Sequence, residues 1–345
     1  MRPETEEDLA ALIRDASAPL SVIGGGTRLW PGEGQGTRLD MTAMTGVTLY
    51  EPEALTLVVR AGTPLQTVRD ILAAEGQMLG FEPDDLLGST IGGVAATNAS
   101  GARRILSGAA RDALIGVRFV DGQGQIVRNG GRVMKNVTGY DLVKLMAGSR
   151  GQLGVLTELS FRTTPLPQVT TTLRLPDLDA TAAIRAFTVA LGGPHDVSGA
   201  RWTPEHGALI RLEGLSASVA ARCAELARRL SDFGTLSQVE DHPWHVAPSA
   251  ADPGRDVWRI ICRPSQAPSL LERLPQPMLV DWGGALILAA MPAGQPPELP
   301  PFAGHARRVT GGGAAILPPP DPVTERIQHD LRDRFDPRGI FQGGR

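Results

Sequence analysis

The sequence predicts an α+β fold organised in two domains, and three observations lead to this prediction. Its 345 residues exceed what one core usually organises, because domains typically contain roughly 100–200 residues. In the first half, short apolar segments alternate with loops made of glycine and other small residues. In the second half, alternating and amphipathic segments follow one another in the order β-α-β-β-α-β.

Composition and charge argue against several classes of function. The net charge is −3 and the isoelectric point is near 6.1, which gives no sign of a nucleic-acid-binding surface. No apolar run approaches the roughly 18 residues of a membrane span, and the acidic N-terminus lacks the features of a secretory signal. Cys223 and Cys262 form neither a disulfide framework nor a CxxC metal spacing. We therefore expect a reducing, cytoplasmic location and no transmembrane segment.

The most informative segment spans residues 80–104. It combines Gly88, Gly92, Gly93 and Gly101 with serines, threonines and alanines. Such a backbone can approach a ligand closely, and successive N–H groups in a glycine-rich turn can form a concave site for anions such as phosphate. A tight loop at a sheet edge would explain the same composition, because glycine-rich turns are common.

Two further side-chain-poor loops favour a ligand. A predicted strand at 20–23 runs directly into the loop 24–27, and the loop 148–154 precedes another predicted strand at 155–161. The loop 24–27 matches neither standard nucleotide motif. A Rossmann fingerprint would need glycine where Leu29 stands, and a Walker A loop would need Gly-Lys-Ser/Thr.

The remaining first half predicts helices and strands around these loops. Thr5 is expected to cap a helix that runs to about Ala16, and Thr63 a helix that has Pro64 at its first position. Further strands are expected at 47–51, 55–60, 114–120 and 125–128. The proline pair at 165 and 167 marks the end of the first domain, 1–167.

The second half predicts a ferredoxin-like unit. Its expected elements are a strand at 170–175, a helix capped by Asp179, strands around 200–203 and 208–212, a helix capped by Ser216, and a strand at 235–239. Further strands and a helix between 257 and 290 would extend the same sheet, which completes a second domain at 168–320. A charged amphipathic helix at 321–335 opens the segment 321–345, which we expect to return to the first domain.

The three loops, in this order and each beside a strand, resemble the FAD-binding domain of the vanillyl-alcohol oxidase (PCMH-type) flavoprotein family. The matching pieces are 22–27, 88–93 with 98–101, 111–112, and 148–158. Within that family, the segments 76–79, 133–142 and 335–341 resemble the FAD-binding E subunits of glycolate oxidase (glycolate dehydrogenase). The resemblance is dense over 1–167 and returns at 321–345, whereas 168–320 matches only in length and layout.

The resemblance implies a two-subdomain PCMH-type FAD-binding domain followed by an α+β, ferredoxin-like cap domain. Some members of the family attach FAD through a histidine or cysteine, but all six histidines here lie at or beyond His195 and both cysteines lie outside the FAD half. Non-covalent FAD is therefore expected. The cofactor-binding residues that the resemblance implies are Gly24, Gly25, Gly26, Thr27, Ser89, Thr90, Gly92, Gly93, Asn98, Ser100, Gly101, Gly154, Val155 and Leu156.

The same resemblance implies a function, namely the oxidation of glycolate, a small 2-hydroxy acid, to glyoxylate. The partners it implies are a second FAD-binding subunit and an iron–sulfur subunit, through which the chain could lie peripherally at the inner face of the cell membrane. Two alternatives stay open. One is a flavin-fold scaffold subunit without turnover, and the other is a stand-alone FAD-dependent dehydrogenase for another 2-hydroxy acid.

Residues for catalysis or metal binding do not stand out in the sequence, and we assign none. His242 and His245 flank Pro243 and lack a third nearby ligand, which argues against a metal site. Glu205 beside His206 could form an acid/base pair, but an exposed hairpin turn explains the two residues better.

Overall fold

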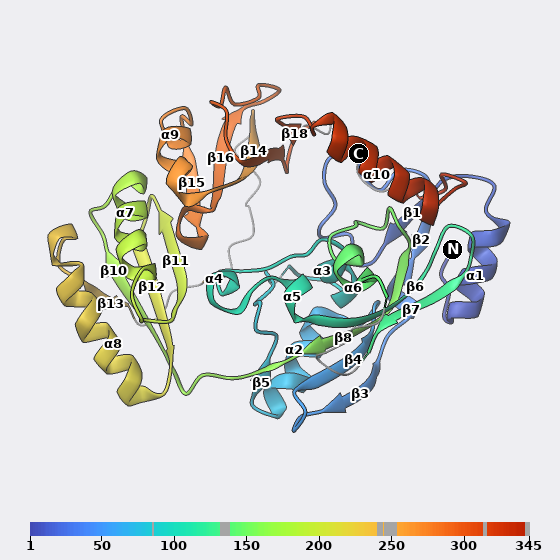
Figure 1. Cartoon of the computed structure of the whole chain (residues 1–345), viewed down its shortest axis with the longest axis horizontal. Coiled ribbons are helices and arrows are strands. Elements are labelled where there is room, and N and C mark those ends of the chain that lie inside the picture. The colour runs from blue at the N-terminus through green and yellow to red at the C-terminus, as the bar shows by residue number, and fades with distance from the viewer. Residues whose placement is uncertain (85, 132–138, 240–243, 245–253, 313–315, 342–345) are drawn as a thin grey trace. The chain divides into compact units, whose positions relative to one another are not determined.

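The structure is a computed structural model that describes residues 1–345 except 85, 132–138, 240–243, 245–253, 313–315 and 342–345 (Figure 1). Most of the segment 133–142, together with His242 and His245, lies outside the described residues. The contacts divide the chain into two units. Unit 1 comprises Met1–Ser100, Gly108–Leu166 and Pro320–Arg345, and unit 2 comprises Gly101–Ser107 and Pro167–Pro319.

Unit 1 contains a five-stranded antiparallel sheet. Its order is β3 (Val47–Glu51), β4 (Thr56–Arg60), β8 (Val155–Arg162), β6 (Leu114–Val120) and β7 (Ile126–Gly130). A core of Leu57, Val68, Ile91, Phe119 and Phe161, among others, joins the sheet to its helices. These are α2 (Leu65–Ala74), α3 (Ile91–Ala96), α5 (Ala110–Ala113) and α6 (Leu142–Met146), and a short pair of strands, β5 (Gln77–Met78) and β9 (Thr164–Pro165), lies in the same unit.

A second, smaller core in unit 1 holds the N-terminal segment. Helix α1 (Glu6–Asp15) begins where the Thr5 hydroxyl accepts a hydrogen bond from the Asp8 N–H at 3.1 Å, which confirms the predicted cap. The strands β1 (Leu20–Ile23) and β2 (Thr37–Asp40) pair in parallel. Leu9, Ile13 and Leu39 pack together with the methionines that follow β2 and with the C-terminal tail. The two cores give unit 1 the two subdomains that the sequence predicts.

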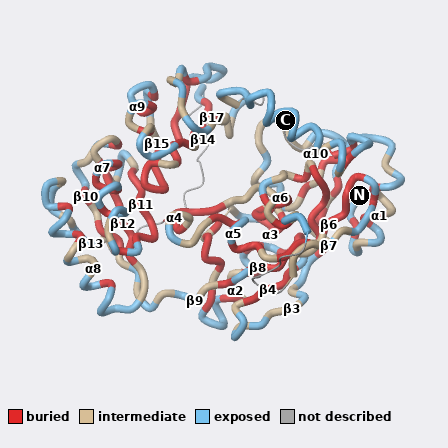
Figure 2. Tube along the Cα trace, in the orientation of Figure 1, coloured by how far each residue is buried: buried red, intermediate tan, exposed pale blue. Residues whose placement is uncertain are grey.

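The C-terminal helix α10 (Pro322–Phe335) and its tail belong to unit 1. Asp321 caps the helix by accepting hydrogen bonds from the N–H groups of Val323 and Thr324. The helix is largely exposed (Figure 2), but the Phe335 ring lies 6.1 Å from the Phe119 ring, centroid to centroid. The Asp336 carboxylate then accepts from the N–H groups of Ile340 and Phe341, which fixes the tail.

Unit 2 is built on a nine-stranded sheet in the order β13-β10-β12-β11-β15-β16-β14-β17-β18. Its first half is the predicted β-α-β-β-α-β unit, with antiparallel neighbours in the spatial order 4-1-3-2. The elements are β10 (Val169–Leu175), α7 (Ala180–Leu191), β11 (Val197–Thr203), β12 (Gly207–Gly214), α8 (Ser216–Arg229) and β13 (Ser237–Val239). Glu205 and His206 lie in the turn between β11 and β12, with Glu205 exposed.

The second half of the sheet repeats this strand order. Its elements are β14 (Arg255–Cys262), α9 (Ala267–Leu271), β15 (Pro277–Asp281), β16 (Leu286–Pro292), β17 (Gly304–Arg308) and β18 (Ile316–Leu317). β17, β14, β16 and β15 again lie in the order 4-1-3-2. One bridge, Trp202 to Val280, joins the two halves through β11 and β15. Unit 2 also includes α4 (Arg104–Ser107), which contacts β11.

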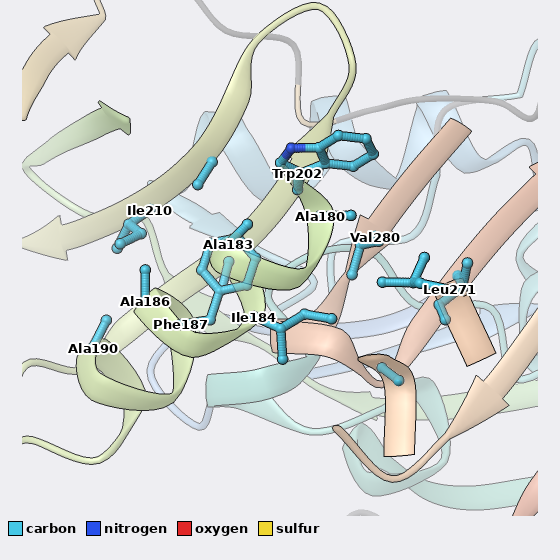
Figure 3. Close-up of a cluster of buried hydrophobic side chains, with 14 of the residues drawn as sticks. Ala180, Ala183, Ile184, Ala186, Phe187, Ala190, Trp202, Ile210, Leu271 and Val280 are labelled. Atoms are coloured by element: carbon cyan, nitrogen blue, oxygen red, sulfur yellow. The ribbon is translucent and has the colours of Figure 1, made fainter. Parts of the chain in front are cut away.

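Apolar side chains of the helices cover one face of this sheet. Helix α7 presents a stripe of small and large side chains that includes Ala183, Ile184 and Phe187 (Figure 3). They pack with Ile210 and Val280 from the strands in one buried cluster (Figure 3). The α7 cap is as predicted, because the Asp179 carboxylate accepts from the Ala182 N–H at 2.7 Å.

Two predicted caps are wrong. Thr63 does not cap α2, because its hydroxyl accepts from the Gly46 N–H and donates to the Arg60 carbonyl, and Pro64 occupies the cap position. Ser216 is the first helical residue of α8, after Leu215 at the cap position. A hydroxyl beside a helix start can serve a neighbouring loop instead, and spacing alone does not distinguish the two uses.

Candidate functional site

A pocket in unit 1 lies where three loops meet: the loop after β1, the loop into α3, and the loop into β8. The space inside it is about 740 Å³, including the part open to solvent. Its lining is mostly glycine, threonine and aliphatic side chains. The lining residues are Val22, Ile23, Gly24, Gly25, Gly26, Thr27, Arg28, Leu29, Glu33, Met41, Ala61, Thr90, Gly92, Gly93, Ala96, Thr97, Arg150, Gly151, Gly154 and Leu156.

The loop after β1 offers hydrogen-bond donors to this pocket. Parallel pairing with β2 holds β1 in place up to Ile23, and the loop 24–27 follows at once. In the part of the chain that the structure describes, the backbone N–H groups of Gly25, Gly26 and Thr27 donate to no protein atom. Gly26 has φ +72°, in the left-handed region. Successive free N–H groups with such a turn can hold a phosphate oxygen.

Close contact with the loop before α3 explains why the first loop needs glycine. A Cβ at Gly24 would lie 2.3 Å from the Thr90 hydroxyl oxygen, and one at Gly25 would lie 1.7 Å from the Gly88 carbonyl oxygen. The Thr27 and Ser89 hydroxyls are hydrogen-bonded at 2.9 Å. The two loops therefore pack backbone against backbone, with no space for side chains between them.

The N–H groups at the start of α3 are already used within the protein. The Ile91 N–H donates to the Thr63 carbonyl at 3.0 Å and the Gly92 N–H to the Ala61 carbonyl at 2.7 Å. The Gly93 N–H donates to the Thr90 hydroxyl at 3.2 Å, so Thr90 is the helix cap. This segment therefore contributes surface and close approach, and the first loop contributes the free N–H donors.

The loop into β8 is attached to the far end of α3. The Gly148 N–H donates to the Ala95 carbonyl at 3.0 Å, and the Arg150 N–H donates to the Ala96 carbonyl at 2.8 Å. Gly154, with φ +152°, lets the chain enter β8 directly against Phe119, which a Cβ would approach to 2.8 Å. Helix α3 thus positions two of the three loops.

Comparison with known proteins agrees with this geometry. A family model described as an FAD binding domain matches residues 1–130. The chain is 35% identical over 334 residues to the glycolate oxidase subunit GlcE of Escherichia coli (strain K12), an alignment that covers 95% of this chain and 92% of that protein. The chain belongs to the GlcE family. Its cofactor is FAD, and the enzymes related to it are FAD-dependent oxidoreductases.

Other relatives share a part of the chain. A mitochondrial cytochrome-type D-lactate dehydrogenase of Arabidopsis thaliana is 29% identical, but the alignment covers 55% of this chain and 35% of that protein. The glycolate oxidase subunit GlcD of Bacillus subtilis is 34% identical over 50% of this chain and 38% of its own length. A solved alkyldihydroxyacetonephosphate synthase matches with a TM-score of 0.67 at 16% identity, over 99% of this chain and 74% of that one. The last match confirms the predicted fold class.

One feature of the pocket fits FAD, namely the backbone N–H donors of the loop 24–27. Three neighbouring N–H groups that donate to no described protein atom suit the diphosphate of a dinucleotide. Nine of the predicted cofactor-binding residues line the pocket, namely Gly24, Gly25, Gly26, Thr27, Thr90, Gly92, Gly93, Gly154 and Leu156.

Five predicted residues lie elsewhere, and their contact with FAD stays a prediction. Ser89 is buried behind Thr27. Asn98 accepts from the Arg111 N–H, and Ser100 accepts from the Ala110 N–H, so both hold the chain at the start of α5. Val155 is fully buried in the small core of unit 1, and Gly101 belongs to unit 2.

Sequence reasoning missed two charged residues of the pocket lining, Glu33 and Arg150. Both carried a signal in the sequence. Glu33 stands between Gly32 and Gly34, and Arg150 is the one charged residue within the loop 148–154. A charged side chain among glycines indicates a specific structural role.

Metal chemistry finds no support in the described residues, where no three His, Cys, Asp or Glu side chains gather as ligands. Burial raises the pKa of the Cys262 thiol to about 11, so this thiol stays protonated and inert at neutral pH. None of the helices formed by the described residues has the length and apolar character needed to cross a bilayer.

Proposed function

We propose that this chain is the FAD-binding subunit of a complex that oxidises glycolate to glyoxylate. The N–H groups of Gly25, Gly26 and Thr27 would hold the diphosphate of FAD, and the bound cofactor would supply the acceptor for the hydride equivalent from the α-carbon of glycolate. The hydroxyl proton would leave to a base or to water, so that the products are glyoxylate and reduced flavin. Electrons then pass to partner subunits. The chain contributes non-covalent binding and orientation of the cofactor through the three loops of unit 1.

One observation carries this proposal, namely the near full-length match to a glycolate oxidase subunit. The relatives with D-lactate dehydrogenase names align with only about half of this chain. The match to GlcE covers 95% of this chain and therefore includes unit 2 as well. Glycolate is therefore a better supported substrate than lactate.

The partners we propose are a second FAD-binding subunit and an iron–sulfur subunit. GlcE and GlcD are both named as subunits of glycolate oxidase, and GlcD also aligns with half of this chain. These two names support a complex with two related flavin subunits. An iron–sulfur subunit would accept electrons one at a time from reduced flavin, and attachment of such a complex would bring the chain to the inner face of the membrane.

A scaffold role without turnover is the second candidate, and one observation favours it. Among the described residues of the pocket lining, Glu33 is the only carboxylate, and Arg150 binds it. The lining therefore offers no unengaged side-chain base for the hydroxyl proton of a substrate. In this case the partner flavin subunit would carry out catalysis.

The absorbance spectrum of the purified chain, before and after addition of glycolate, tests both candidates. A visible flavin spectrum that bleaches with glycolate under anaerobic conditions is the expected result for the enzyme. D-lactate serves as the matched substrate control. A flavin spectrum that glycolate leaves unchanged would assign turnover to the partner, and a chain that takes up no FAD would contradict the proposal.

A further inference from the structure

Arg150 occupies an unusual position in the pocket. It has φ +54°, in the left-handed region that side-chain-bearing residues rarely adopt, although glycines stand at 148 and 151. Such a conformation persists only where surrounding contacts impose it, and these residues concentrate at functional sites. Its side chain is nine-tenths buried, with a relative exposure of 10%. The unfavourable backbone conformation of Arg150 therefore indicates that its contacts serve a function.

The side chain of Arg150 makes several contacts with one turn of the first loop region. Its Nε donates to Glu33 Oε1 at 2.7 Å, and its Nη2 donates both to Glu33 Oε2 and to the Arg28 carbonyl. The guanidinium lies over the Trp30 ring, with Cζ 3.4 Å from the ring centroid. Two parallel hydrogen bonds and a stacked face are the strongest arrangement available to an arginine.

The turn that receives Arg150 is held by two hydrogen bonds of its own. The Glu33 N–H donates to the Trp30 carbonyl at 3.0 Å, with Pro31 and Gly32 between them, and Gly32 has φ +87°. Proline second and a positive-φ glycine third are the features of a type II turn. The Trp30 N–H also donates to Glu33 Oε2 at 2.8 Å, which aims the carboxylate.

The main chain of Arg150 is fixed to a different element. Its N–H donates to the carbonyl of Ala96, the last residue of α3. One residue therefore connects the turn 30–33 to the helix whose other end packs against the loop 24–27. Arg28, Glu33 and Arg150 all line the pocket, so the connection closes one wall of the cavity.

We propose that Arg150 is a positioning residue that locks the turn 30–33 against α3 and thereby slows the release of FAD. This inference rests on the proposed cofactor role of the pocket. Arg150 acts indirectly, because it holds the turn 30–33 that forms part of the cavity wall. Loss of the lock lets the turn 30–33 move away from α3, which opens a route out of the cavity. The two hydrophobic cores of unit 1 include no residue of the turn 30–33, so both cores keep their contacts when the lock is lost.

The test measures the rate of FAD dissociation from the full chain, followed by the rise of free flavin fluorescence after dilution. The variant Arg150→Gly removes the side chain and keeps the backbone conformation, since glycine adopts positive φ readily. We expect dissociation to be faster by about tenfold to about a hundredfold, as for loss of a charge-assisted pair. Arg150→Lys keeps the charge without the two-nitrogen contact and should lie between.

The matched control is Arg118→Lys, which weakens another two-nitrogen pair, Arg118 with Glu6, that is in unit 1 but outside the pocket lining. It should leave FAD dissociation within about twofold of the wild-type rate. Arg150→Gly leaves the buried Glu33 carboxylate without its partner and should lower the melting temperature of the apoprotein, so dissociation is compared below the melting temperature of each variant. Glu33→Gln should speed release, and should have no further effect when combined with Arg150→Gly.

Different outcomes separate this inference from the proposed function. If the wild-type chain holds FAD and Arg150→Gly releases it at the wild-type rate, the positioning role is wrong and the cofactor role stands. The positioning role is equally wrong if Arg118→Lys speeds release as much as Arg150→Lys does. If the wild-type chain holds no FAD, both proposals fail. Should Arg150→Gly not fold, Arg150→Lys and Glu33→Gln give the same decision.

Discussion

Both units bury an arginine against a carboxylate, but they place the pair on different kinds of structure. In unit 2, Arg201 on β11 binds Asp281 on β15, with side-chain exposures of 3% and 2%. In unit 1, Arg150 and Glu33 both lie on loops. The pair in unit 2 joins two neighbouring strands of one sheet, next to the single bridge between Trp202 and Val280. The pair in unit 1 sets where two loops stand, which is how a buried ion pair can acquire a role in ligand binding.

The largest expected effect comes from breaking the pair in unit 2. Asp281→Ala leaves the Arg201 guanidinium buried without its carboxylate, and also removes the acceptor of the Trp282 N–H. We expect a loss of about 3–5 kcal/mol in the free energy of unfolding, measured by urea denaturation. FAD dissociation from the folded fraction should not change.

The control for this prediction is Glu272→Ala, which removes an exposed carboxylate from unit 2 and should change the free energy of unfolding by less than about 0.5 kcal/mol. If Asp281→Ala cost no more than this control, the pair would not be the strongly coupled contact that its burial indicates. The contrast between the two units would then lose its basis.

An intermediate effect is expected where backbone packs against backbone in the pocket. Gly25→Ala would put a Cβ 1.7 Å from the Gly88 carbonyl oxygen, which forces the two loops apart. We expect a loss of about 1–3 kcal/mol in stability and weaker FAD binding, because the free N–H groups move with the loop. Isothermal titration of the apoprotein with FAD measures the second effect.

Gly131→Ala is the matched control, because a Cβ at Gly131 would meet no described atom within 4 Å and its φ is not positive. It should bind FAD as the wild type does. Equal affinity in Gly25→Ala would show that the N–H groups of the loop 24–27 are not the phosphate donors.

The smallest expected effect concerns a pair in unit 1 that lies outside the pocket lining. Burial raises the pKa of Glu6, but hydrogen bonds from Arg118 and Thr157 outweigh it, and the net pKa lies below the ordinary value of 4.5. A carboxyl whose pKa is lowered by folding contributes stability above its unfolded pKa and loses it as the pH falls through the folded pKa. The stability advantage of wild type over Glu6→Gln should therefore shrink below pH 4.5, as urea denaturation at several pH values would show. A difference independent of pH would contradict this.

Much of the fold followed from local patterns. The strand β6 (Leu114–Val120) and the strand β1 (Leu20–Ile23) match their predicted ranges. A short apolar run between turn residues is stable when it forms a buried strand, so its bounds can be read from the sequence. The caps at Thr5 and Asp179 were predictable for the same reason. Thr63 was not, since its hydroxyl bonds to Gly46, which is 17 residues away. Sequence spacing contains no information about such a partner.

The predicted residues of the candidate site also fall into two groups, those that line the pocket and those that bond or pack elsewhere. Glycines at 24–27 and 88–93 identified two pocket loops because only residues without bulk permit backbone contact. Asn98, Ser100 and Val155 share the composition of those loops, yet they bond or pack elsewhere. Whether a small residue faces a cavity or the protein depends on the direction of the chain at that point.

By itself, the sequence determined the order of most of the longer strands and helices, the loops that could contain no large side chain, and the membership of a flavoprotein family. Only the tertiary structure decided that the donors free to bind an anion lie in the loop 24–27, and that those at the start of α3 are used internally. It also decided that Arg150 meets Glu33, 117 residues away. The physical reason is that the local pattern of residues indicates which side chains a segment can bury and where side chains must be small. Pairing between polar groups that are distant in sequence depends on where the fold places them.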